Sequence, residues 1–163
     1  MTTARREYFL LVAGLILLII TGAAVYYIQR APNRSRDVAQ ITTLVTNFGG
    51  YEKSISLQAD IELLKSDIQQ NYGTFVTDTL LQQWRADPTH APGRLTSSPW
   101  PDHIEIDSIT PQGAGYTVSG RIIMMSSTGK TGEVPVVLIV LQEDGEWRIA
   151  AYQEQIVSNE EDA

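Results

Sequence analysis

The feature that most constrains this chain is an apolar run near its N-terminus, from Tyr8 to Ile28, which contains no charged residue. As a helix rising about 1.5 Å per residue, such a run covers about 30 Å, the hydrocarbon thickness of a bilayer. Arg5 and Arg6 precede the run, Arg30 follows it, and tyrosines stand at both of its ends. Aromatic residues at the ends of an apolar run are typical of a membrane–water interface. The run therefore predicts a single-pass transmembrane helix over 8–28.

A cleavable signal peptide is the alternative interpretation. Gly22 and Ala24 are small residues with the spacing needed for cleavage after Ala24. The run continues past Ala24 to Ile28, however, and exceeds the roughly 7–15 residues of a signal peptide's apolar region. We therefore predict an uncleaved anchor in the cell membrane. The flanking positive charges nearly balance, but the N-terminal tail is short and a chain without cysteine suits the exterior, so we expect the polar domain to be extracytoplasmic.

The composition bounds the polar part to a single acidic domain. The net charge is −7, and setting aside the anchor and its flanks leaves nine basic and eighteen acidic residues. This balance argues against binding to nucleic acid. With no cysteine and two histidines, the chain offers no disulfide framework or zinc finger, and we predict no cofactor and no metal. The expected segments are a tail 1–7, the anchor 8–28, a linker 29–35, the domain 36–158 and an acidic tail 159–163.

The first half of the domain has helical periodicity. Apolar residues recur at spacings of three and four, and Gly49-Gly50 is expected to break or kink the first helix. The second helix has an apolar stripe that begins at Ile61, and the third begins at a capping residue. Three helices are predicted: from Arg36 to the Gly49-Gly50 pair, from Leu57 to Tyr72, and from Thr77 or Asp78 to Asp87.

The period changes to two after the proline-rich segment 88–101. Apolar and polar residues alternate around Ile104 and Ile106 and then through Tyr116–Met124. Val134–Leu141 is almost continuously apolar, which is typical of a central strand. An Asp-Gly hairpin at 143–146 then leads into a last strand, Trp147–Ile156. Helices followed by four antiparallel strands in a meander predict the α+β class.

The element order and the ending Val-Val-Leu-Ile-Val-Leu-Gln-Glu-Asp-Gly-Glu-Trp-Arg-Ile-Ala-Ala-Tyr resemble the NTF2-like superfamily. Many of its members close with a turn that reads Asp-Gly-x-Trp-x-Ile, matched here by Asp144, Gly145, Trp147 and Ile149. The resemblance covers Arg36 to Val157 and implies an NTF2-like or cystatin-like cone, a curved sheet wrapped around helices. The anchored arrangement is similar to VirB8-type and TcpC-type proteins of bacterial conjugation machines, and to a small domain of some penicillin-binding proteins.

The superfamily contains enzymes as well as scaffolds, so the resemblance leaves the function open. Its enzymes use an Asp or His base inside the cone, which makes Asp102 and His103 the candidate catalytic residues. The alternative is that Asp102 caps the turn after Pro101 and leaves His103 on the surface. Asp87 and His90 lack the spacing of a metal motif, and we predict no metal site.

Three residues are candidates for binding: Trp84, Trp100 and Arg94. Trp100 stands between two prolines, where it either presents its ring to a partner or plugs the open end of the sheet against Trp84. Ile123 and Met125 belong to an apolar block and are candidates for an interface with a second copy through the outer sheet face. Coverage of this block by the chain's own helices or ends is the alternative.

These observations favour a membrane-anchored, non-catalytic binding or assembly module of a bacterial envelope complex, with protein partners and with a homodimer through the sheet as one arrangement. The alternatives are a small-pocket enzyme of the isomerase or dehydratase kind and a ligand-sensing accessory domain. An apolar pocket that holds a buried acid would favour the enzyme. A cone filled by its own side chains would favour the module.

Overall fold

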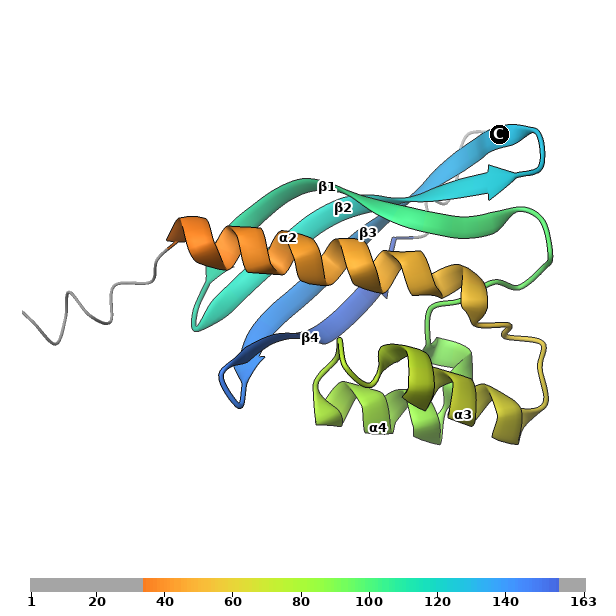
Figure 1. Cartoon of the computed structure of the whole chain (residues 1–163), viewed down its shortest axis with the longest axis horizontal. Helices are drawn as coiled ribbons and strands as arrows, with labels where there is room; N and C mark the ends of the chain where they lie inside the picture. The colour runs from red at the N-terminus through yellow and green to blue at the C-terminus, as the bar shows by residue number, and fades with distance from the viewer. Residues whose placement is uncertain (1–33, 156–163) are drawn as a thin grey trace, which may run out of the picture. The chain divides into compact units, whose positions relative to one another are not determined.

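Three helices pack on a four-stranded antiparallel sheet in this α+β domain (Figure 1). The structure is a computed structural model and describes residues 34–155. The predicted membrane helix 8–28 and the tails 1–7 and 159–163 lie outside the described residues. Within 34–155, no helix has both the length and the apolar character needed to cross a membrane. The elements are α2 (Arg34–Tyr51), the 3-10 helix η1 (Glu52–Ser54), α3 (Ile61–Tyr72), α4 (Asp78–Ala86), the 3-10 helix η2 (Pro88–His90), β1 (Trp100–Gln112), β2 (Gly115–Ser126), β3 (Gly129–Glu143) and β4 (Glu146–Glu154).

The strand order β1-β2-β3-β4 confirms the predicted meander. Each strand pairs antiparallel with the next one along the chain. Between β3 and β4, Asp144 and Gly145 both have positive φ, 53° and 85°. A two-residue hairpin turn of this kind requires positive φ at both positions, which an Asp-Gly pair accepts readily. The Asp-Gly signal therefore located this turn correctly.

Helix α2 runs through Gly49-Gly50 to Tyr51, so the predicted break there is wrong. Gly49 is buried, and a Cβ at this position would lie 2.8 Å from the backbone nitrogen of Ile104 on β1. The glycine lets the helix backbone approach the sheet more closely than any other residue would allow. The first glycine of the pair thus marks a packing contact, whereas Gly50 has no atom within 4 Å of an added Cβ. The helix also begins at Arg34, two residues before its predicted start at Arg36.

Helix α3 begins at Ile61, four residues later than predicted, because Asp60 caps it by accepting a hydrogen bond from the backbone N–H of Glu62 at 3.0 Å. Ile61, expected in the apolar stripe, is 47% exposed. Helix α4 confirms the predicted cap, since the side chain of Thr77 accepts a hydrogen bond from the N–H of Leu80.

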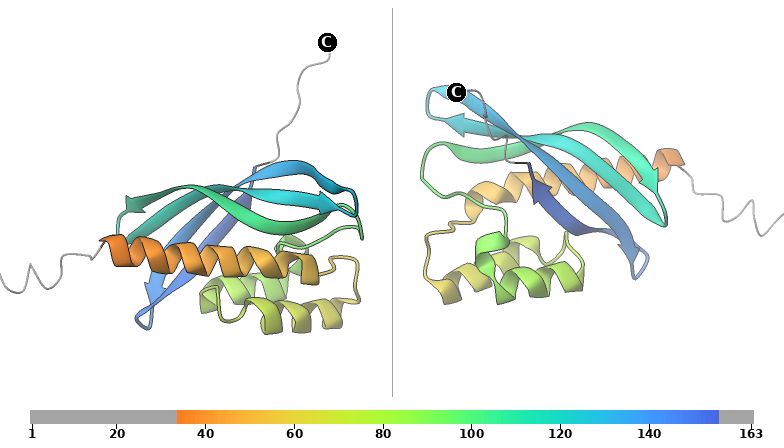
Figure 2. Two further views of the ribbon diagram at one scale, coloured as in Figure 1. Left: turned by 45° about the horizontal axis from the view of Figure 1, so that its top comes forward. Right: turned by 180° about the vertical axis from the view of Figure 1, so that it is seen from behind.

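In both views of Figure 2 the helices lie on one side of the sheet, here called the helix-facing side. An aromatic cluster fills part of this side. Phe48 from α2 lies 4.9 Å from Tyr72 and 6.4 Å from Trp84, measured between ring centroids. Tyr152 from β4 meets both Phe48 and Trp84 edge to face. Rings in these tilted and edge-to-face arrangements add attraction beyond the area that they bury.

Candidate functional site

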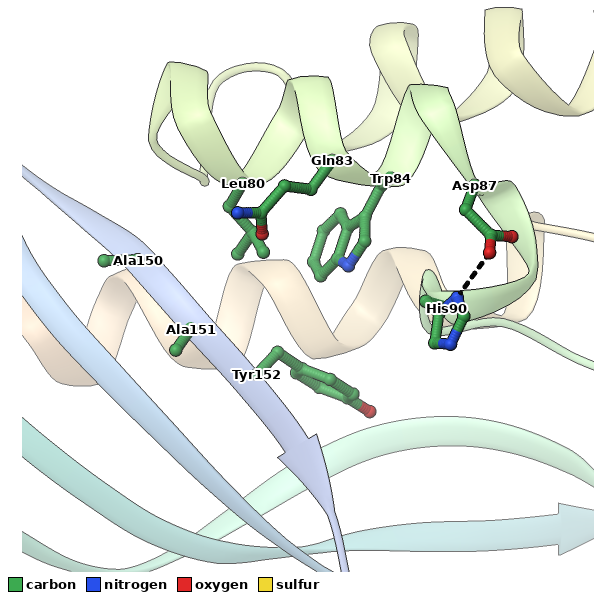
Figure 3. Close-up of a pocket in the computed structure, with 8 residues that line it drawn as sticks. All are labelled: Leu80, Gln83, Trp84, Asp87, His90, Ala150, Ala151 and Tyr152. Atoms are coloured by element: carbon green, nitrogen blue, oxygen red, sulfur yellow. Dashed lines mark ion pairs between the residues drawn. The ribbon is translucent and has the colours of Figure 1, made fainter.

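Among the described residues, two hollows and one charged cluster are candidate sites. The first hollow, here called the edge groove, has a volume of about 520 Å³ and lies between α4, η2 and the edge strand β4 (Figure 3). Its floor is apolar, and an ion pair between His90 Nδ1 and Asp87 Oδ2, 3.0 Å apart, stands at its rim. The lining residues are Leu80, Gln83, Trp84, Asp87, His90, Ala150, Ala151 and Tyr152.

The edge groove exists because a short segment docks on β4 ahead of α4. The N–H of Ile149 donates to the carbonyl of Phe75, and the N–H of Thr77 donates to the carbonyl of Ile149, both at 2.9 Å. This parallel bridge covers the strand edge at Ile149 and fixes the start of α4 beside it. The strand order places no further strand beyond β4 within 34–155. The part of the edge that follows Ile149 therefore faces the groove.

The second hollow, here called the acid cavity, has a volume of about 310 Å³ and lies under β2, β3 and the end of β4. Apolar side chains supply most of its wall. The polar groups are the carboxyls of Glu52 and Glu154, the guanidinium of Arg94 and the hydroxyl of Thr96. The lining residues are Glu52, Gly93, Arg94, Leu95, Thr96, Pro99, Pro101, Ile122, Met124, Val134 and Glu154.

Glu52 is the most unusual of these groups, because only 1% of its surface is exposed. Its carboxyl Oε1 lies 3.4 Å from the hydroxyl oxygen of Tyr152, and that hydroxyl donates to Glu154 Oε1 at 2.9 Å. Burial, and next the negative charge of Glu154, raise the pKa of Glu52 well above its ordinary value, against a smaller lowering by the Tyr152 hydroxyl. Burial with so little compensation favours the protonated form of this carboxyl.

Sequence analysis missed Glu52 because it ended the first helix at the glycine pair. Ile41, Val45 and Phe48 form the buried stripe of α2, and Glu52 follows four positions later. Continuing the helical spacing through the glycines would have placed Glu52 on that stripe. A charged residue at a core position of an amphipathic pattern was therefore the available signal.

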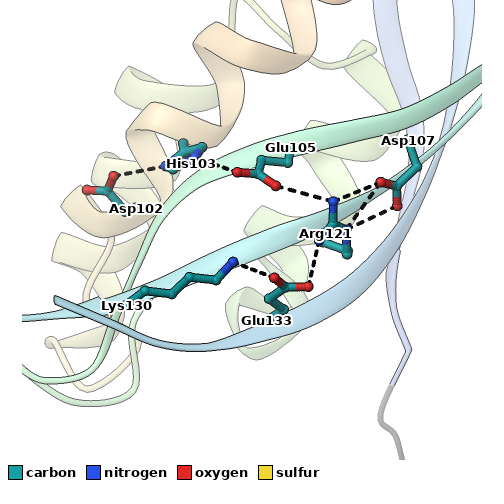
Figure 4. Close-up of polar contacts among 7 residues, drawn as sticks. All are labelled: Asp102, His103, Glu105, Asp107, Arg121, Lys130 and Glu133. Carbon is teal, nitrogen blue, oxygen red and sulfur yellow. Dashed lines mark hydrogen bonds and ion pairs between the residues drawn. The ribbon is translucent and has the colours of Figure 1, made fainter.

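On the outer face of the sheet, Arg121 is surrounded by three carboxylates (Figure 4). Its guanidinium lies 3.2 Å from Glu105, 3.1 Å from Asp107 and 2.7 Å from Glu133. Glu133 also pairs with Lys130. The hydrogen bonds that Lys130 and Arg121 donate to Glu133 lower the pKa of Glu133. Those that Arg121 donates to Glu133 and Asp107 raise the pKa of Arg121.

The two catalytic candidates do lie together. His103 Nδ1 is 3.0 Å from Asp102 Oδ2, and Lys53 Nζ is 3.2 Å from Asp102 Oδ1. The hydrogen bond with His103, and then the contact with Lys53, lower the pKa of Asp102. Both side chains remain partly exposed, 32% for Asp102 and 44% for His103. Neither residue lines the edge groove or the acid cavity.

The candidate binding residues separate into three settings. Trp84 is 3% exposed and belongs to the aromatic cluster, although its ring also lines the edge groove. Arg94 lines the acid cavity, and its backbone is held by Ile55 and Leu57 through hydrogen bonds of 2.8 Å and 3.0 Å. Trp100 is half-buried at the start of β1, opposite Met125, and is not among the described residues that form the core or pack against it.

The interface candidates differ from each other in exposure. Ile123 is 2% exposed, so the described part of the chain already covers it. Its cross-strand neighbours are His103 on β1 and Glu133 on β3. Met125 is half-buried. The apolar block therefore presents little of Ile123 to a second copy.

Among the described residues, no three His, Asp or Glu side chains gather in a way that would hold a metal ion. Comparison with models of protein families, with curated proteins and with solved structures finds no match to this chain. The site geometry therefore has to carry the functional argument.

Proposed function

We propose that the chain is a membrane-anchored, non-catalytic binding module of a bacterial envelope complex, held by 8–28 in the membrane and presenting an NTF2-like domain outside the cytoplasm. The uncharged run at 8–28 supports the anchor. Helices followed by a four-stranded meander support the NTF2-like assignment. An anchor also confines the domain near other proteins of the same membrane and so raises its effective concentration toward them.

The observation that carries this proposal is the edge groove beside β4. The segment 75–77 already pairs with this edge at Ile149, and the strand continues beyond it through Ala150 and Ala151 along the groove. An extended peptide can add to an open strand edge through main-chain hydrogen bonds, while neighbouring pockets select its side chains. The apolar floor of the groove, formed by Leu80, Trp84 and Tyr152, offers such a pocket. The partner proposed is therefore an extended segment of another protein.

The aromatic cluster also supports a binding role over turnover. Phe48, Tyr72 and Trp84 occupy the interior on the helix-facing side, where the enzymes of this superfamily place their base. Asp102 and His103, the residues expected to supply that base, are partly exposed and lie with Lys53 outside both hollows. Their arrangement resembles a surface ion-pair network, in which neighbouring charges satisfy one another.

Site-directed photo-cross-linking in intact cells tests the proposal. A photoreactive amino acid at Gln83, in the edge groove, should capture a membrane or envelope protein. The matched control is the same amino acid at Gln82, an exposed neighbour that does not line the groove. Capture at Gln83 with little at Gln82 supports docking in the groove. Equal capture at both positions, or none at Gln83, would remove the groove from the proposal.

A small-pocket enzyme is the second candidate function, and one observation favours it: the buried Glu52, with its raised pKa, beside Tyr152 in the acid cavity. Carboxyls with a raised pKa serve as general acids in many enzymes. The test is Glu52→Gln in the cell. Loss of the cellular phenotype with unchanged capture through Gln83 would favour the enzyme, and a retained phenotype would leave the binding module.

A further inference from the structure

The acid cavity combines a small volume, apolar walls and two carboxyl groups. Its volume of about 310 Å³ lies at the lower end of the range of small-molecule sites. Ile122, Met124 and Val134 supply wall from the sheet, and the loop that contains Pro99 supplies the opposite wall. Such walls favour an apolar group. The polar end of any ligand would meet the carboxyls.

The hydroxyl groups around Glu52 hydrogen-bond more closely to other acceptors than to its carboxyl. A tyrosine hydroxyl has one proton, and that of Tyr152 is donated to Glu154 at 2.9 Å. The hydroxyl of Tyr72 donates to the carbonyl of Pro92 at 2.8 Å. The contact from the Tyr152 hydroxyl to Glu52 Oε1 is longer, 3.4 Å, so this hydrogen bond compensates the buried carboxyl only weakly.

The nearby cations leave Glu52 unpaired as well. Lys53, the next residue, is directed to Asp102 at 3.2 Å. Arg94 lines the same cavity, but within the described residues no ion pair joins it to Glu52. The cavity thus holds two carboxyl groups, and a cationic guest between them would favour the charged form of each.

We infer that the acid cavity binds a primary ammonium group on a short apolar stem, with Glu52 and Glu154 as its anionic partners. An ammonium group carries three donors, enough to reach both carboxyls at once. It relieves the repulsion between them, and the apolar walls take the stem. A carboxylate ligand would meet Glu154 as a like charge, and an alcohol would gain a hydrogen bond without the ion pair. This inference does not rest on docking in the edge groove.

Binding of the ammonium form displaces the proton of Glu52. The carboxyl O–H bond breaks, the proton passes to the buffer, and the resulting carboxylate pairs with the ammonium, which keeps its own three protons. The groups that face Glu52 are Tyr152 and Glu154 on β4, Tyr72 on α3 and Arg94 in the loop. The two tyrosines have raised pKa values, because both are buried next to Glu52 and Glu154, so they keep their protons near neutral pH. Glu52 is therefore the source of the released proton.

Calorimetry on the full chain in lipid nanodiscs tests the inference, with butylamine as the probe and 1-butanol and butyrate as its neutral and anionic counterparts. Butylamine should bind most tightly and should release close to one proton at neutral pH, measured by comparing buffers of different ionisation enthalpy. Glu52→Gln should weaken the affinity for butylamine by at least about tenfold and abolish the proton release, because the buried partner charge is gone. Glu105→Gln, on the outer face, is the control that should leave both unchanged.

Circular dichroism would verify that each variant is folded. Equal binding of 1-butanol and butylamine, tighter binding of butyrate through Arg94, or unchanged butylamine binding in Glu52→Gln would each overturn the inference.

A second experiment identifies the source of the ammonium group. An apolar peptide with one lysine that binds more tightly than its Nε-acetylated form, and more tightly than butylamine, would indicate a partner's lysine, whereas butylamine binding alone would indicate a free amine. Capture through Gln83 remains a separate readout.

Discussion

The two faces of the sheet hold carboxyl groups in opposite ways. On the helix-facing side, Glu52 is 1% exposed and contacts one hydroxyl at 3.4 Å. On the outer face, Glu133 is shared between Arg121 and Lys130, and water reaches all three side chains. The same chemical group therefore has a raised pKa on one face and a lowered pKa on the other. Solvent and the sign of the nearest charge determine which state each carboxyl adopts.

This difference between the two faces indicates which carboxyl groups are expected to serve a function and which only keep the surface polar. Outer-face carboxylates are compensated by cations of the same chain, so they need nothing further. Glu52 costs stability where it lies, and a residue that costs stability without a compensating partner is expected at functional sites. A functional carboxyl is therefore expected on the helix-facing side and not on the outer face.

The largest expected effect is loss of the aromatic cluster on the helix-facing side. Trp84→Ala should lower the free energy of unfolding by about 3–5 kcal/mol, because a buried ring in contact with Phe48, Tyr72 and Tyr152 leaves a cavity. Urea unfolding followed by the remaining tryptophan fluorescence measures it. Trp100→Ala is the matched control and should cost less, since Trp100 is half-buried. Equal losses would mean that Trp100 also plugs the interior.

Next in size is the pH dependence of stability contributed by Glu52. The folded carboxyl holds its proton at pH values where the unfolded one, with an ordinary pKa of 4.5, has lost it. Stability should therefore fall as pH rises above about 4.5, by up to about 1.4 kcal/mol per pH unit, until the raised folded pKa is passed. Glu52→Gln should remove this slope, so its advantage over the wild type grows as pH rises from about 4.5 toward the raised folded pKa.

Glu133→Gln sharpens the comparison because its slope has the opposite sign. The lowered pKa of Glu133 means that its contribution is present above the ordinary value and is lost as pH falls through the folded pKa. Thermal unfolding across pH measures both variants. Parallel slopes for Glu52→Gln and Glu133→Gln would contradict the assignment of a neutral, buried Glu52.

A smaller effect is expected where α2 meets β1. Gly49→Ala should destabilise the domain by about 1–3 kcal/mol, because the new methyl group would lie 2.8 Å from the backbone of Ile104. Gly50→Ala, with no atom within 4 Å of the new methyl group, should stabilise the helix by roughly 0.5–1 kcal/mol. Chemical denaturation compares the two. Equal signs for the two variants would mean that Gly49 is not in close contact with the sheet.

Periodicity predicted the fold well for helices and strands that bury one face and expose the other. The change from a period of three or four to a period of two placed the helices before the meander, and the Asp-Gly pair located the last hairpin. It failed at Gly49-Gly50, where local propensity favours a break but tertiary contact with Ile104 rewards a glycine within the helix. The helix propensity of a single residue carries no information about a tertiary contact of this kind.

The candidate site was less predictable, because it depends on side chains far apart in the sequence. Glu52 comes from η1, Arg94 from a loop and Glu154 from the end of β4. A register shift between Ile139 and Val140 marks a bulge on this strand pair, and Ile149 before it and Tyr152 after it both reach the helix-facing core. Simple alternation would have placed these two residues on opposite faces. Asp102 and His103, adjacent in sequence, were easy to find and lie outside both hollows.

The smallest expected effect lies on the outer face, at Arg121. Arg121→Gln leaves Glu105, Asp107 and Glu133 close together without the guanidinium that they share, so their mutual repulsion should lower the melting temperature slightly at low salt. Because water and counterions reach these exposed groups, added sodium chloride should remove most of the difference from the wild type. Differential scanning calorimetry at low and high salt measures both values. A loss that approaches that of Trp84→Ala, or one that salt does not reduce, would mean that the outer-face cluster is structural and that the contrast between the two faces is wrong.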